Sequence, residues 1–189
     1  HLLAGRSYLA AFDSLHEAAL QRRALSDYPA VRALLELLDA AWRGLGGVEA
    51  DPRRGRISLL RSHVATNQRR LDEALASAWE ALSLARQHGW LEVERAALVR
   101  VGQVSYARGD LDSSDRHYEE ARVRTAAAGD RALLADAVKG LASVALHRGD
   151  RERAARLFAE ACEESLQIGD GLGAADCKRG LAVTAKQEG

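Results

Sequence analysis

Small and apolar residues recur along most of the chain at the spacing of one face of an α-helix. One set, at i, i+3, i+4 and i+7, consists of Leu98, Val101, Gly102 and Ser105. A second set with the same spacing lies further along the chain and consists of Val138, Leu141, Ala142 and Ala145. This spacing places each set on one buried stripe of a helix. The pattern therefore predicts an all-α fold with no strand.

The sequence repeats itself, with a period of about 40 residues that is typical of helical-repeat proteins. Aligning residues 91–130 with residues 131–170 gives ten identities, against about three expected by chance for this composition. One identical stretch is Arg108-Gly109-Asp110, which returns as Arg148-Gly149-Asp150. The glycine supplies a left-handed residue that ends one helix, and the aspartate caps the next helix. Each repeat is therefore expected to be a hairpin of two helices of about 17 residues, each ~25 Å long.

The repeat register divides the chain into segments. We expect repeats at about 56–89, 91–129 and 131–169 and a half repeat at 171–189, all within a region from 51 to 189. Residues 1–50 are expected to form a diverged N-terminal helix pair that continues the same stack. The whole chain is then one right-handed α-solenoid of about nine helices. Because the chain begins with His1 and contains no methionine, we expect it to be a piece of a longer protein.

Small side chains recur where the two helices of a hairpin are expected to approach most closely. They are Gly102, Ala142 and Ala182 in the first helices and Ser114 and Ala154 in the second helices. Later in each second helix, Tyr118 and Phe158 are expected to fill the wedge beneath. This order of small residue, glycine turn, small residue and aromatic residue resembles the tetratricopeptide repeat over roughly residues 56–189.

Two departures from the tetratricopeptide pattern favour its long-helix variety. Leu98 and Val138 stand where a bulky aromatic residue is usual, and Gly-Asp replaces the proline that usually closes the repeat. With these departures the chain resembles the longer repeats, of about 40 residues each, in bacterial signalling and transcriptional regulators. The resemblance implies a scaffold that binds proteins or peptides in a groove lined by the first helices.

The repeat register indicates which side chains line this groove. The candidate ligand-binding residues are His63, Asn67, Arg100, Gln103, Tyr106, Lys139, Ser143, His147 and Arg179. These residues combine cations, amides and one aromatic ring with no acid, which favours an extended peptide with acidic groups. The family's carboxylate-gripping pattern of paired Lys and Asn is only approximated, by Arg100, Lys139 and Arg179. The alternative is that all these side chains are merely solvated.

Charge and composition narrow the classes of partner. Lys plus Arg and Asp plus Glu both number 27, whereas dedicated nucleic-acid binders carry a basic excess. The segment from Arg43 to Arg70 holds seven arginines against Glu49 and Asp51. We interpret this segment as a solvated basic edge, with contact to nucleic acid or to an acidic partner as the alternative. With no apolar run long enough to span a bilayer and no signal peptide, we expect a cytoplasmic protein that does not contact membranes.

Residues suited to catalysis or metal binding form no recognisable set. His16 begins a segment like the helix motif of zinc proteases, but Leu20 replaces the second histidine that the metal needs. Cys162 and Cys177 are expected to be buried structural thiols. We therefore expect no catalytic residue, no metal site, no cofactor and no enzymatic activity.

The leading interpretation is a non-enzymatic protein- or peptide-binding scaffold. The resemblance implies that it is the sensor or interaction region of a larger bacterial regulator. The alternative is a self-contained peptide-responsive regulator or an oligomerisation platform. The last predicted helix exposes Leu181 and Ala185 with no partner helix before Gly189, so we also expect self-association through this end.

Overall fold

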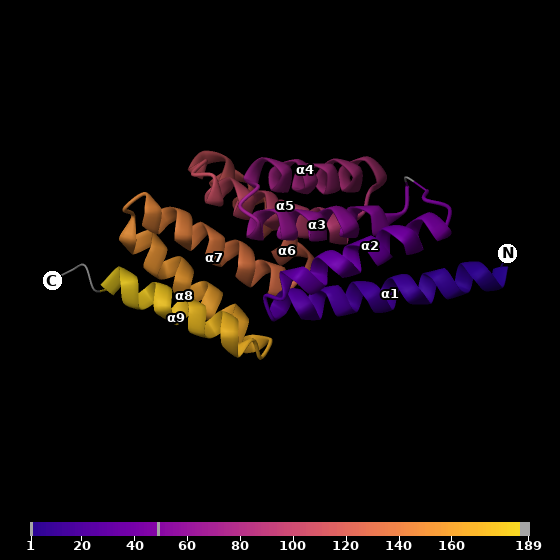
Figure 1. Ribbon diagram of the computed structural model, residues 1–189. Helices are drawn as coiled ribbons and strands as arrows, with labels where there is room; N and C mark the ends of the chain where they lie inside the picture. Colours follow the sequence, from indigo (N-terminus) through magenta and orange to yellow (C-terminus); the bar gives the residue numbers. More distant parts are fainter. Residues whose placement is uncertain (1, 49, 186–189) are drawn as a thin grey trace. The chain divides into compact units, whose positions relative to one another are not determined.

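The computed structural model describes residues 2–48 and 50–185, which form nine α-helices and no strand (Figure 1). The helices are α1 (Leu2–Ala24), α2 (Tyr28–Gly44), α3 (Pro52–Asn67), α4 (Leu71–His88), α5 (Leu91–Ala107), α6 (Leu111–Ala128), α7 (Arg131–His147), α8 (Arg151–Gln167) and α9 (Gly171–Ala185). Within each unit, helices that follow one another in the chain pack side by side, as in α3 with α4 and α7 with α8. The predicted all-α helical-repeat fold is confirmed for the described residues, while the right-handed turn of the stack stays a prediction.

The chain divides into two compact units, His1–Ala97 and Leu98–Gly189. The first unit holds α1 to α4 and the start of α5, and the second holds the rest of α5 and α6 to α9. In the first unit, α1, α2 and α3 enclose a core of large apolar side chains. Fully or almost fully buried members of this core are Phe12, Val31, Leu38, Ile57 and Leu60.

Small residues mark the closest approach within each hairpin, as the sequence predicts. In the first unit, the Ser62 hydroxyl on α3 donates a hydrogen bond to the carbonyl of Ala74 on α4, at 2.8 Å. In the second unit, the Ser114 hydroxyl on α6 donates to the carbonyl of Gly102 on α5, at 2.9 Å. The next repeat has Ala142 and Ala154 at the equivalent positions, both fully buried.

Aromatic residues of the even-numbered helices in the second unit pack against glycines of the odd-numbered helices. The Tyr118 ring on α6 lies against Gly102 on α5 and Gly140 on α7. One repeat later, the Phe158 ring on α8 lies against Gly180 on α9. The 40-residue repeat of the sequence is therefore also a repeat of packing contacts, which we call the packing register. In it, each of these aromatic residues lies against a glycine on the following helix.

Gly-Asp turns join the helices from α5 to α9 in the expected way. Each aspartate accepts a hydrogen bond from a backbone amide in the first turn of the next helix, at 3.0 Å for Asp110 and 3.2 Å for Asp130. The glycine before each aspartate is left-handed, with φ of +83° at Gly109. Arg69 is the register equivalent of Gly109 and is also left-handed, with φ of +62°. This non-glycine residue is a point at which the first unit departs from the repeat pattern.

The face of α9 that matches buried stripes of α5 and α7 is partly open. Leu141 and Ala142 on α7 are fully buried, whereas Leu181 on α9 is half-buried and Ala182 is exposed. The predicted turn at Gly189 lies outside the described residues. Self-association through this end stays a prediction.

Candidate functional site

The odd-numbered helices of the second unit present a row of polar side chains. Gln103 and Tyr106 on α5 are half-buried, and so are Lys139 and Ser143 on α7. The Tyr106 ring meets the ring of His147 edge-on, with 5.8 Å between their centroids. The structure thus brings Tyr106 of α5 and His147 of α7 together, and Lys139 and Ser143 lie on the same helix as His147. The Tyr106–His147 pair gives this surface an aromatic element held in a defined orientation.

Carboxylates that the sequence analysis did not include form ion pairs with two of the three predicted cations, Lys139 and Arg179. Lys139 Nζ lies 3.0 Å from Asp136 Oδ1, and Arg179 forms an ion pair with Asp176. Burial alone would lower the pKa of Lys139, but Asp136 outweighs burial and raises it. The two pairs occupy equivalent positions of the register on α7 and α9, so these two helices carry ion pairs rather than free cations. The i−3 spacing of each aspartate was the signal that could have revealed them.

Arg100 does not belong to this row, contrary to the sequence-based expectation. Its residue exposure is only 6%, and its guanidinium donates a hydrogen bond to Gln103 at 3.1 Å. The repeat register explains the error, because Arg100 is equivalent to Gly140 and Gly180 rather than to Lys139. Those glycines lie against aromatic rings, and Arg100 is likewise a packing position.

The two predicted groove residues of the first unit lie on α3. His63 is half-buried, and its Nε2 atom lies 3.2 Å from Nη1 of Arg23 on α1. Asn67 is exposed at the last turn of α3. Sequence reasoning missed Arg23, although it is the register equivalent of His63 one repeat earlier. The register was followed only loosely into the N-terminal helices, where few identities support it.

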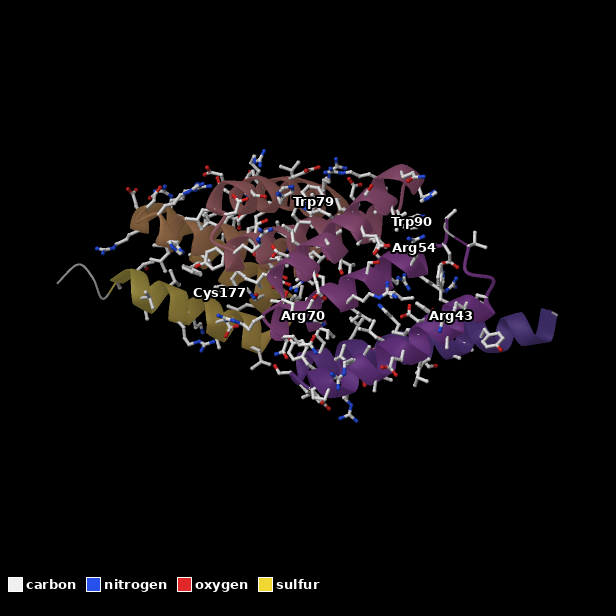
Figure 2. All side chains as sticks on the ribbon, turned by 45° about the horizontal axis from the view of Figure 1, so that its top comes forward. Arg43, Arg54, Arg70, Trp79, Trp90 and Cys177 are labelled. Carbon is white, nitrogen blue, oxygen red and sulfur yellow. The ribbon has the colours of Figure 1, made fainter. Side chains whose placement is uncertain are left out.

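The arginine-rich segment from Arg43 to Arg70 is largely neutralised by ion pairs within the first unit. Arg54 pairs with Glu80 at 2.9 Å, and Arg61 pairs with Asp39 at 2.7 Å. Burial alone would raise the pKa of Glu80, but hydrogen bonds from Arg54 and Ser58 hold it below its usual value. Arg54 lies at the start of α3, whereas Arg70 lies beyond its end, at the N-cap of α4 (Figure 2). This distribution favours the solvated basic edge over a nucleic-acid surface.

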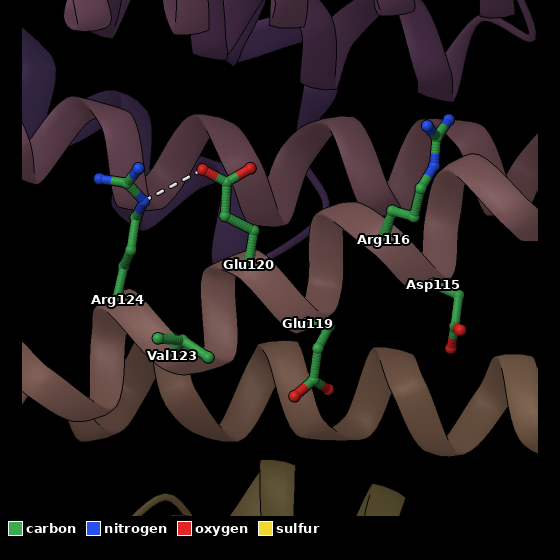
Figure 3. Close-up of a pocket in the computed structure, with 6 residues that line it drawn as sticks. All are labelled: Asp115, Arg116, Glu119, Glu120, Val123 and Arg124. Carbon is green, nitrogen blue, oxygen red and sulfur yellow. Dashed lines mark hydrogen bonds and ion pairs between the residues drawn. The ribbon is translucent and has the colours of Figure 1, made fainter.

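A shallow depression of about 630 Å³ lies on the outer side of α6 (Figure 3). Its described lining consists of Asp115, Arg116, Glu119, Glu120, Val123 and Arg124. Arg124 pairs with Glu120 at 3.1 Å, and Asp115 accepts from Arg153 at 3.3 Å. These charged side chains form one ion pair within α6 and one between α6 and α8. They do not converge on a common point where a ligand could bind.

The cysteines are buried thiols, as predicted. Cys162 on α8 is 8% exposed and Cys177 on α9 is fully buried. Burial raises the pKa of the Cys177 thiol, despite the nearby Lys139. The residues that the structure describes contain no group of three histidine, cysteine or acidic side chains that could hold a metal ion. None of the described helices combines the length and apolar content needed to cross a bilayer.

Many solved structures are similar to this chain, and two of them are described below. One is a signal transduction ATPase with numerous domains and a tetratricopeptide repeat sensor from Pyrococcus horikoshii, at a TM-score of 0.68 and 20% identity. The match covers 92% of this chain and 26% of that protein, so the chain spans about a quarter of its length. The other is BtubC from P. vanneervenii, at a TM-score of 0.57 and 15% identity, covering 98% of this chain and 91% of that one.

No family model matches the chain, and no curated protein is similar to it in sequence. At identities of 20% and 15%, the similarity to the two solved structures shows the fold alone. The chain therefore has a helical-repeat fold like that of a protein with a tetratricopeptide repeat sensor.

Proposed function

We propose that this chain is a non-enzymatic scaffold that binds a protein or an extended peptide through its odd-numbered helices. The observation that carries the proposal is the polar row on α5 and α7, where Tyr106 and His147 meet edge-on over a fully packed core. An aromatic pair beside half-buried polar groups provides contact area for a ligand. The tetratricopeptide-like repeat inferred from the sequence supports the same reading.

The ion pairs on α7 and α9 indicate which chemical groups a ligand would carry. Lys139 with Asp136 on α7, and Arg179 with Asp176 on α9, each offer a donor and an acceptor side by side. Such pairs suit the alternating amide and carbonyl groups of an extended backbone together with side chains of either charge. In the second unit, we therefore propose recognition of an extended peptide without a strict requirement for acidic residues.

The parent protein is part of the same proposal. The Pyrococcus protein combines an ATPase with a tetratricopeptide repeat sensor, and this chain corresponds to 26% of it. We propose that this chain is likewise the interaction region of a larger regulator. A self-contained regulator or oligomerisation platform is the second candidate, favoured by the half-buried Leu181 and the exposed Val183 on α9.

Selection of peptides from a display library against the purified chain tests the proposal. A selected peptide should bind about tenfold more weakly to the variant that combines Tyr106→Ala with His147→Ala. The matched control combines Arg116→Ala with Val123→Ala on the outer side of α6 and should leave binding unchanged. Equal affinities of the two double variants, with melting temperatures like that of the wild type, would show that the row is not the binding surface.

A further inference from the structure

The last described helix, α9, leaves open a face whose counterpart on α7 is buried. Four residues of α7, which packs against α8, are buried, namely Ala135, Val138, Ala142 and Ala145. Their register equivalents on α9 are all exposed, namely Ala175, Lys178, Ala182 and Ala185, and we name these four residues the open stripe. Among the described residues, no helix covers the open stripe as α8 covers the equivalent face of α7.

A partly apolar hollow adjoins the open stripe in the groove between α8 and α9. It encloses about 500 Å³, and its described lining consists of Ala159, Cys162, Glu163, Leu166, Gln167 and Leu181. Leu181 precedes Ala182 of the open stripe and is half-buried, whereas its equivalent on α7, Leu141, is fully buried. Leu166 on α8 is 57% exposed. Apolar surface that stays exposed in this way marks an interaction site.

The even-numbered helices of the second unit show what such a surface accepts. Each buries a small residue, an aromatic residue four positions later and an alanine three positions after that; these are Ser114, Tyr118 and Ala121 on α6 and Ala154, Phe158 and Ala161 on α8. On α6, both Ser114 and Tyr118 contact Gly102 of the preceding helix. The register equivalent of Gly102 on α9 is Ala182, in the middle of the open stripe.

A glutamate recurs in the even-numbered helices, six positions after the small residue, as Glu80, Glu120 and Glu160. In the first unit, the Ser58 hydroxyl on α3 donates a hydrogen bond to Glu80 Oε2 on α4, at 2.8 Å. Ser58 is the register equivalent of Lys178. A glutamate at this position of a packed helix can therefore reach the position that Lys178 holds on α9.

Lys178 is the cation that such a glutamate would need. In the second unit, Glu160 on α8 lies 3.4 Å from Arg122 on α6, but Cys162 stands at the register position of Arg122 on α8. Lys178 replaces the buried Val138 of α7, is exposed, and forms no ion pair within residues 2–48 and 50–185. The positive charge is thus moved from the even-numbered helix to the open stripe.

We infer that the open stripe and the adjoining hollow bind an amphipathic helix of a partner protein. The helix has a small residue at i, an aromatic residue at i+4, a glutamate at i+6 and an alanine at i+7, and it lies antiparallel to α9. Its small and aromatic residues pack on Ala182, and its glutamate pairs with Lys178. The open stripe contains no acid, so charge complementarity favours this partner over a second copy of α9.

This surface is separate from the Tyr106–His147 pair, so the inference goes beyond the proposed function. The probe is a fluorescently labelled peptide of residues 151–167 in which alanine replaces the cysteine, because it carries Ala154, Phe158, Glu160 and Ala161 in the required order. Fluorescence anisotropy follows its binding to the purified chain. The same peptide with Phe158→Ala should bind about tenfold more weakly, since it lacks the aromatic anchor.

An exchange of charges tests the pairing with Lys178. Lys178→Glu in the chain should weaken binding of the probe about fivefold. A peptide with Glu160→Lys should bind the Lys178→Glu chain as tightly as the original probe binds the wild type. The matched control is Arg156→Glu, which reverses the charge of a side chain on α8 that is 66% exposed and lies outside the open stripe. This control should bind the probe like the wild type.

Ala182→Gln tests the close approach. Ala182 is exposed, so the variant should melt like the wild type, yet it should bind the probe about tenfold more weakly because the longer side chain holds the helix away. The variant that combines Tyr106→Ala with His147→Ala should bind the probe normally. These two results separate the inference from the proposed function, which depends on the other surface.

Three results would each overturn the inference. The first is a probe that does not bind the wild type, and the second is a charge exchange that does not restore binding. The third is sedimentation in which the chain alone dimerises and Ala182→Gln abolishes the dimer, because a second copy would then occupy the open stripe. In each case the proposed function would still stand if a selected peptide bound through the Tyr106–His147 pair.

Discussion

Replacing Gly140 by alanine tests the packing register that organises the second unit. A Cβ atom at this position would lie 2.5 Å from Cε2 of Tyr118 and closer still to Cζ, whereas carbon atoms in contact are normally about 3.5–4.0 Å apart. The ring has little room to move, because it is 4% exposed and also lies against Gly102. The clash therefore has to be relieved by shifting helices rather than by rotating a side chain.

The expected destabilisation follows from two opposing effects. Overpacking of a core costs about 1–3 kcal/mol, and the upper end applies to Gly140→Ala because backbone and buried ring collide. Alanine gains about 1 kcal/mol over glycine inside a helix. The net loss in the free energy of unfolding is about 2 kcal/mol, which lowers the melting temperature by about 4–8 °C for a chain of this size.

Denaturant and thermal melts followed by circular dichroism measure this loss. Gly171→Ala is the control, because a Cβ at Gly171 meets nothing within 4 Å, and its effect should stay within about 0.5 kcal/mol. Combining Gly140→Ala with Tyr118→Ala should cost less than the sum of the single changes by about 2 kcal/mol. A Gly140→Ala variant that melts with the wild type would refute the packing register.

Three further predictions concern stability. Ala142→Leu should lose about 1–3 kcal/mol by overpacking, because Ala142 is fully buried at the closest approach of α7 and α8; unchanged urea melts would contradict this. Arg69→Gly should gain about 1 kcal/mol by removing the strain of φ +62°, and a loss of stability would show that the Arg69 side chain matters more. Burial raises the pKa of Tyr118, so its contribution to stability is fully present below about pH 10, the usual pKa of tyrosine, and is lost as the pH rises from there toward the raised pKa. Tyr118→Phe should therefore lose less stability than the wild type between about pH 10 and 11.5, and equal alkaline losses would exclude Tyr118 as the cause.

Much of the fold could be predicted because its rules are local and recur in every repeat. The small residues Gly102, Ser114 and Ala142 were recognised as points of close approach from spacing alone, and hydrogen bonds and burial confirm this. The Gly-Asp turns were recognised because glycine and aspartate have specific roles at helix ends. Arg69 was not recognised as left-handed, because nothing in an arginine indicates that conformation.

The candidate site was harder to predict than the fold, because surface side chains follow the register only in part. Arg100 was grouped with Lys139 by charge, although its register equivalent is Gly140, a packing position. The i−3 aspartates, such as Asp136, pair within their own helices and leave no mark on the apolar pattern. Arg23 approaches His63 from a helix with few identities to later repeats. Contacts between charged side chains of different helices can be identified only once the structure is known.

The most direct test of the interaction scaffold is a map of where a selected peptide binds. Backbone amide chemical shifts of the full chain, recorded with and without the peptide, locate the contact residue by residue. The account predicts that the largest changes lie on the odd-numbered helices, around Tyr106, Ser143 and His147. Changes confined to the outer sides of α6 and α8, or a library that yields no binding peptide, would contradict it.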